Sequence, residues 1–223
     1  NVAVGSRALG SQNAGTDAYN VAVGADAGVS VTTGFRNTIL GGLAADALTT
    51  GDNNVALGFN ALSSDTQGDR NVAIGSAALF AQNFTSTTDA LTDADNNVAI
   101  GRAALSSDTL GSGSIAIGRN ALLVQNFTTA TTSYNIAIGD LAGTAITTST
   151  NNTLIGGLAG DALTSGSLNT AVGYAALSGD TLGVYNTAIG VNALLTQNFT
   201  TSTFSYNTAV GNDAGKSVTT GDS

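Results

Sequence analysis

Residues 71–75 have the sequence Asn-Val-Ala-Ile-Gly, and this short pattern decides the fold of the whole chain. Close variants of it, with the general form Asn-x-Ala-(Val/Ile/Leu)-Gly, occur twelve times in the 223 residues. Successive copies are mostly 17 residues apart, and the other spacings are 19, 21 and 26 residues. The copies begin at residues 1, 20, 37, 54, 71, 97, 114, 135, 152, 169, 186 and 207. A repeat of this period is typical of solenoids, in which each copy forms one turn of the chain.

We call each copy a coil and count its positions from the Asn of the pattern, which is position zero. Position four is Gly and position seven is Ala in all twelve coils, and position three is always Val, Ile or Leu. The alternation across positions one to three predicts a short strand, and the glycines predict corners. Coils stacked about 4.8 Å apart would pair their backbones. The sequence therefore predicts an all-β chain, a parallel β-solenoid (β-roll or β-helix) of twelve coils forming one repeat domain over residues 1–223.

The composition restricts the possible functions. The chain has no His, Cys, Met, Trp or Pro, and all 15 of its acidic residues are Asp. Without imidazole or thiolate groups, the common nucleophilic sites and zinc sites cannot form. We therefore expect no enzyme, no catalytic residue, no cofactor and no metal. The net charge of −9 disfavours nucleic acid and anionic membranes as partners, and no apolar stretch is long enough for membrane insertion.

Position zero predicts a structural ladder. An Asn amide both donates and accepts hydrogen bonds, so asparagines stacked in register can bond along the rod. We favour this role over ligand binding for the asparagines of this column: Asn20, Asn37, Asn54, Asn71, Asn97, Asn135, Asn152, Asn169, Asn186 and Asn207.

A second column consists of threonine at position twelve of every 17-residue coil, from Thr32 to Thr219. Threonine favours extended backbone and bonds within turns, which is the interpretation we prefer. A flat array of threonines is also a feature of an ice-binding surface. A β-solenoid binding module such as an ice-binding protein is therefore the alternative function.

Position two suggests self-association. If the Val and Ile side chains at positions one and three fill the coil, position two faces outward and forms an apolar strip too long for a monomer to expose. Small side chains in register suit a parallel homotrimer, intertwined or side by side, with its symmetry axis along the rod. The competing arrangement is a monomeric solenoid of three walls with a narrow, alanine-rich core. The interface candidates are Ala22, Ile39, Ala56, Ala73, Ala99, Ala116, Ala137, Leu154, Ala171 and Ala188.

All four coils longer than 17 residues contain Gln-Asn at positions eleven and twelve, which predicts loops at one corner of the rod. Three of these loops continue with Phe-Thr, which makes Phe84, Phe127 and Phe199 the candidates for contact with a partner. The alternative is that each ring lies beneath its own loop. Asp89, Asp93 and Asp95 lack the pattern of a strong calcium loop, and a solvated turn is the preferred interpretation.

The unit at Asn71–Gly75, repeated at 97–101 and 186–190, resembles the head repeats of trimeric autotransporter adhesins (YadA-like) and related repeats of bacteriophage tail fibres. The resemblance implies a trimeric surface fibre with a structural or receptor-binding role. It also implies an extracellular location, on a cell or virion surface, and a cell-surface receptor or glycan as a partner beside the chain itself. The longer period, the fixed Ala at position seven and the Gln-Asn loops differ from the adhesin heads. The absence of capping coils leads us to expect a fragment of a longer fibre.

Overall fold

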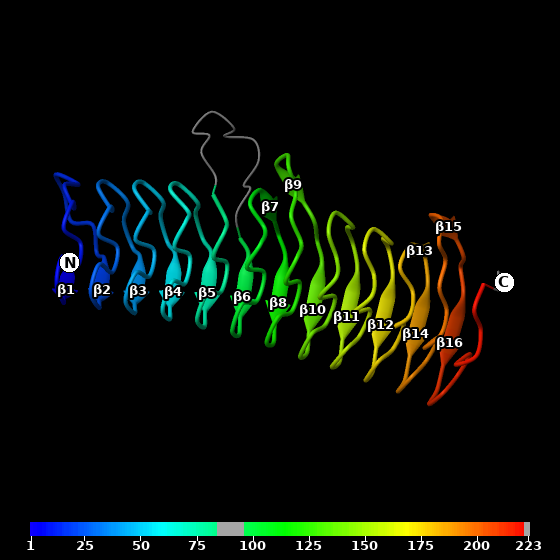
Figure 1. Cartoon of the computed structure of the whole chain (residues 1–223). Helices are drawn as coiled ribbons and strands as arrows, with labels where there is room; N and C mark the ends of the chain where they lie inside the picture. Colours follow the sequence, from blue (N-terminus) through cyan, green and yellow to red (C-terminus); the bar gives the residue numbers. More distant parts are fainter. Residues whose placement is uncertain (84–95, 221–223) are drawn as a thin grey trace.

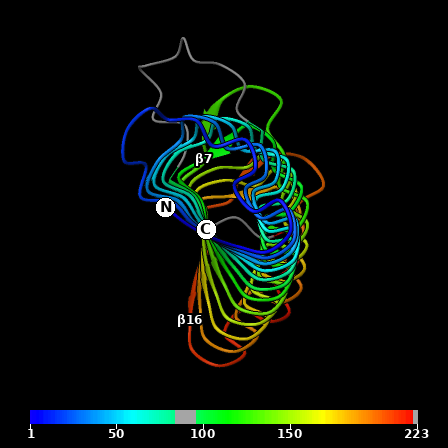
Figure 2. The same cartoon turned by 90° about the vertical axis from the view of Figure 1, so that its left-hand side faces the viewer.

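A computed structural model describes residues 1–83 and 96–220 and shows a parallel β-solenoid with no helix in these ranges (Figure 1). The chain advances by one coil per repeat from the amino-terminal to the carboxy-terminal end of the rod. Viewed along the axis, the coils lie one behind another and rotate progressively (Figure 2). This rotation is what the inherent twist of parallel strands produces. The predicted fold class and the coil count are therefore confirmed.

Each coil contributes one three-residue strand, at positions one to three, to a single twelve-stranded parallel sheet. Neighbouring strands pair in register, so that Ala73 lies beside Ala99 and Ile74 beside Ile100. The strands of this sheet are β1 (Val2–Val4), β2 (Val21–Val23), β3 (Thr38–Leu40), β4 (Val55–Leu57), β5 (Val72–Ile74), β6 (Val98–Ile100), β8 (Ile115–Ile117), β10 (Ile136–Ile138), β11 (Thr153–Ile155), β12 (Thr170–Val172), β14 (Thr187–Ile189) and β16 (Thr208–Val210).

Two smaller sheets lie at the corner where the long coils carry their loops. Strand β7 (Gly111–Ser112) pairs in parallel with β9 (Thr131–Thr132), and β13 (Gly183–Val184) pairs in parallel with β15 (Thr203–Phe204). In both cases a loop residue of a long coil extends the backbone pairing with the preceding coil. The loops are thus anchored to the rod by backbone hydrogen bonds.

The turn that follows each strand contains left-handed residues. Positions six and eight have positive φ in every coil, for example Ala103 (54°) and Leu105 (51°). The amide of Ala103 donates to the Ser76 carbonyl of the preceding coil, whereas the amide of Leu105 donates to the Ala121 carbonyl of the following one, at 3.0 and 2.9 Å. The inter-coil bonding therefore continues through the turn in alternating directions. These bonds offset the cost of the left-handed backbone.

Glycine at position four is required because the coils approach one another closely there. Gly101 has a φ of +133°, and a Cβ added to it would lie 2.5 Å from the Gly118 carbonyl oxygen of the next coil. Any larger residue would separate the two coils. This contact explains why position four does not vary along the chain.

The core is narrow and formed mainly by alanine and leucine. Alanines at positions two and seven are buried in every coil except the first and, at position seven, the last, and every leucine at position eight is buried. Where position eight is Leu, position eleven is Asp or Gln, and where position eight is Gly or Ala, position eleven is Val, Leu or Ile. One large apolar side chain per coil from this pair of positions therefore fills the interior. The interior keeps close packing as its composition changes from coil to coil.

Candidate functional site

The twelve-stranded sheet is the largest sheet in the described residues, and its outward face forms one continuous surface. It consists of the side chains at positions one and three, which are exposed or half-buried in every coil. Position three is Val, Ile or Leu throughout, and position one is Val, Ile or Thr, so neither column contains a charged residue. Exposed members include Leu40, Ile155 and Ile189. We call this surface the sheet face.

The expected orientation of the strand was therefore wrong. The ten residues expected at an oligomer interface, from Ala22 to Ala188 with Ile39 and Leu154 among them, are fully buried inside the coil. They are core residues and cannot touch another chain. The physical reason is the width of the coil, because the leucines at position eight leave room only for alanine opposite them. The competing expectation of an alanine-rich core describes the interior correctly.

Two features of the sequence could have revealed this orientation. Asn at position zero and Ala at position two share a strand face, and an Asn that bonds to other coils belongs inside. The two large residues at position two also occur beside small residues at position eight. The side chain of Ile39 fills the space next to Gly28, and Leu154 fills the space next to Gly143 and Gly160. Such compensation is expected only within a shared core.

The asparagines of position zero are buried and bond from coil to coil, but through the backbone more than through paired amides. The Asn54 Oδ1 accepts a hydrogen bond from the backbone amide of Asn71 at 2.9 Å, and its Nδ2 donates to the Gly68 carbonyl at 2.7 Å. Similar pairs recur at Asn37 and Asn169. Each of these three asparagines therefore joins the start of its coil to the end of the same coil and to the next one. This makes the column part of the scaffold.

A second polar column inside the rod was not predicted. The buried Gln125 donates to Asp108 at 2.6 Å and accepts from Asn135 at 2.8 Å. Gln197 does the same between Asp180 and Asn207, at 2.7 and 2.8 Å. Gln82 repeats the arrangement between Asp65 and Asn97.

These aspartates also accept hydrogen bonds from backbone amides within their own turns, as expected for turn positions; Asp108 accepts from Gly111 at 3.0 Å. Burial raises the pKa of Asp108, and the hydrogen bond from Gln125 opposes that rise. The sequence signal was available, because each of these Gln residues follows an Asp by 17 positions. The network has a structural role, since its polar groups satisfy one another away from solvent.

The loop phenylalanines do not offer a partner site where the structure describes them. Phe127 and Phe199 are buried, with 5% and 6% of their surface exposed. Their backbone carbonyls accept hydrogen bonds from the threonines of position twelve in the preceding coil, Thr109 and Thr181. The alternative, that these rings lie beneath their loops, is the arrangement observed. Phe84, together with the three aspartates of the longest loop, lies outside the described residues.

The threonines of position twelve use their hydroxyl groups within the rod. Thr49 donates to the Thr66 carbonyl at 2.7 Å, and Thr164 donates to the Thr181 carbonyl at 3.1 Å. These donors hold neighbouring coils together. They are therefore poorly placed to bind an external lattice of water molecules.

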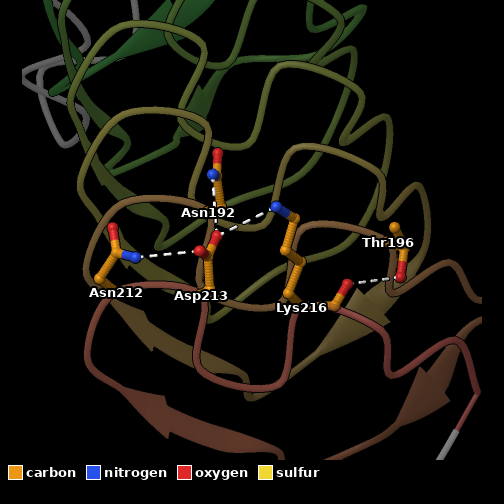
Figure 3. A network of polar contacts seen from close by, with 5 residues as sticks. All are labelled: Asn192, Thr196, Asn212, Asp213 and Lys216. Carbon is orange, nitrogen blue, oxygen red and sulfur yellow. Dashed lines mark hydrogen bonds and ion pairs between the residues drawn. The ribbon is translucent and has the colours of Figure 1, made fainter.

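The last two coils are joined by a polar network at the surface (Figure 3). Asp213 accepts from Asn192 and from Asn212, both at 3.0 Å, and its carboxylate lies 3.2 Å from the Lys216 amine. The pKa of Asp213 is lowered mainly by the hydrogen bond from Asn192, and the hydrogen bond from Lys216 is the second largest cause. Thr196 donates to the Lys216 carbonyl and adds a further link between these coils. The hydrogen bonds from Asn192 and Thr196 cross between the two coils, and the contacts of Asn212 and Lys216 with Asp213 lie within the last coil.

Among residues 1–83 and 96–220, no group of three or more His, Cys, Asp or Glu side chains is arranged to hold a metal ion. The same ranges contain no helix of the length and apolarity needed to span a membrane. No protein-family model, curated protein or solved structure matches the chain. The sheet face and the corner loops are therefore the surfaces from which a function can be argued.

Proposed function

We propose that the chain is a structural and receptor-binding segment of a homotrimeric fibre on a cell or virion surface, with no catalytic activity. The observation that carries the proposal is the sheet face, an uncharged strip along the whole rod that is apolar except for the threonines at position one of five coils. Its twelve strands at about 4.8 Å give a length of about 50 Å, and three residues per strand give an area of roughly 500 Å². That area is near the upper limit of the apolar patches that monomers expose, roughly 300–600 Å².

The charge distribution supports association through this face. The chain carries a net charge of −9, yet neither column of the sheet face contains a charged side chain. Three rods could therefore meet along these columns without bringing aspartates of different chains into contact. A repeated face with one orientation along the rod suits rotational symmetry about a parallel axis. The trimer expected from the sequence is thus retained, with the sheet face replacing the alanine column as its interface.

Sedimentation equilibrium tests the proposal. The wild-type chain should sediment at three times the 21.8 kDa of one chain. The double variant Ile117→Lys/Ile138→Lys places charges at the centre of the sheet face and should sediment as a monomer, because buried unpaired charges are costly. Val124→Lys is the matched control, since Val124 is exposed outside this sheet, and it should remain trimeric. A wild-type mass of one or two chains contradicts the trimer.

A second candidate function uses the same face. Thr153, Thr170 and Thr187 are adjacent in the outward column of position one, beside Val and Ile at position three. This regular array supports the alternative of a β-solenoid ice-binding module better than the internally bonded threonines of position twelve do. Thermal hysteresis of the purified chain tests it. Trimer formation would cover the array, so sedimentation and hysteresis distinguish the two functions.

A further inference from the structure

Three exposed aromatic rings gather at the corner of the rod near its carboxy-terminal end. The rings of Tyr185 and Tyr206 are stacked, with centroids 5.1 Å apart and planes inclined by 11°. Phe204 meets Tyr185 edge to face at 5.6 Å. The three side chains are 41%, 55% and 64% exposed for Tyr185, Tyr206 and Phe204 respectively. We call them the aromatic platform.

The chain contains an internal copy of this corner without the platform. Residues 97–134 match residues 169–206 at an offset of 72, and both contain the same Asp-Thr-Leu-Gly turn and Gln-Asn-Phe-Thr loop. Strands β7 and β9 pair in the first copy in the same register as β13 and β15 in the second. In the first copy, however, Gly113 stands in place of Tyr185, and Thr132 in place of Phe204.

Tyr185 and Phe204 are therefore not needed to form the loop, whereas Tyr206 has a counterpart, Tyr134, in the first copy. The loop of the first copy is held by the same contacts, including a buried serine that donates to the preceding coil, Ser133 there and Ser205 in the second copy. Tyr185 and Phe204 are thus exposed rings that the fold does not require, and contact with a ligand explains such rings better.

We propose that the aromatic platform binds an uncharged oligosaccharide. The CH faces of a sugar ring can stack on exposed aromatic rings, while its hydroxyls bond to polar groups at the edge. Such groups are present in the same loop, where Thr200, Thr201 and Ser202 are exposed. The inference deepens the proposed function, because it rests on the chain acting in surface attachment and names the chemical class of receptor.

The size and charge of the site favour a sugar over a macromolecular partner. At 150–250 Å² for each aromatic side chain, the exposed parts of the three rings amount to roughly 240–400 Å². A stable protein interface needs about 800 Å² on each partner, so the platform alone is too small for one. The net charge of −9 disfavours nucleic acids and acidic sugars.

NMR titration tests the inference. The wild-type chain is titrated with uncharged cello-, malto-, chito- and galacto-oligosaccharides to about 10 mM, while the ring resonances of the platform are followed. At least one series should give saturable shifts of Tyr185 and Phe204. The variant Tyr185→Gly/Phe204→Thr converts the corner to its internal copy, and its affinity should fall about tenfold or more, as expected for losing two stacking rings. Phe204→Thr alone serves as a second, milder variant.

Phe59→Ser is the matched control, because it removes an exposed ring elsewhere and Ser76 holds the same position in the next coil. It should bind as the wild type does. The inference is overturned if no oligosaccharide gives saturable shifts, if both platform variants bind as tightly as the wild type, or if the rings shift with protein concentration alone, which would indicate a second copy as occupant. Sedimentation of the same samples reports the trimer separately, so failure of either proposal is visible without the other.

Discussion

The close approach of coils at position four gives the sharpest test of the fold. In Gly101→Ala, the new Cβ would lie 2.5 Å from the Gly118 carbonyl oxygen, whereas Gly211→Ala would meet only the Ala214 Cβ at 3.9 Å. The two glycines have nearly the same φ, +133° and +129°. The backbone strain is therefore shared, and only the contact with a following coil differs. Comparing the two variants therefore separates the cost of backbone strain from the cost of the steric conflict between coils.

The expected magnitudes follow from these geometries. An alanine forced into this backbone region costs about 1–3 kcal/mol, and this is the whole effect expected for Gly211→Ala. In Gly101→Ala the coils must also separate, which strains the bond from the Gly118 amide to the Ile100 carbonyl, 2.7 Å long. Losing a buried hydrogen bond adds about 1–3 kcal/mol. We expect Gly101→Ala to cost about 2 kcal/mol more than Gly211→Ala, which corresponds to a further decrease in Tm of about 4–8 °C for a chain of this length.

Guanidinium and thermal unfolding followed by far-ultraviolet circular dichroism measure both free energies. Because Gly211 lies in the last coil of the chain, a second pair corrects for position: Ala99→Gly and Ala209→Gly change the same core position in a central and a terminal coil. The difference in unfolding free energy between Ala99→Gly and Ala209→Gly is subtracted from the difference between Gly101→Ala and Gly211→Ala. If the corrected costs of Gly101→Ala and Gly211→Ala are equal, the carbonyl of the next coil is not the reason for glycine at position four.

Three further predictions concern the polar networks. Replacing Gln125 by Leu leaves the buried Asp108 carboxylate without its side-chain donor and should destabilise the chain by about 2–3 kcal/mol, measured by chemical unfolding. Burial raises the pKa of Asp108, so the contribution of this carboxyl group to stability is greatest below the ordinary aspartate pKa of about 3.9 and is lost as the pH rises through its pKa in the folded chain. An asparagine side chain does not titrate, so the Tm of Asp108→Asn relative to that of the wild type should increase between about pH 3 and pH 7. The pKa of Asp213, followed by NMR, should rise in both Asn192→Ala and Lys216→Met, and more in the first, since the hydrogen bond from Asn192 is the larger cause of its decrease.

The solenoid could be predicted from the sequence because its determinants are local and repeated. Glycine at position four and the alternation at positions one to three impose the same corner and strand on every coil, and the structure has this arrangement from β1 to β16. The direction of the strand was harder to predict, because both of its faces are apolar. The larger side chains of Val and Ile favoured their burial inside the coil, but a coil with leucine at position eight has room only for alanine at position two. That width is a tertiary property, and a single strand does not reveal it.

The contacts between coils also determine which features of the sequence are functional and which are structural. The residues that repeat most strictly, the asparagines, glycines and alanines, are those that bond or pack against neighbouring coils. A residue that every coil needs cannot by itself mark a binding site. The aromatic platform has the opposite character, since two of its three rings are absent from the matching internal copy while the loop beneath them is retained. Departures from the repeat that leave the backbone unchanged are therefore where binding specificity should be sought in this chain.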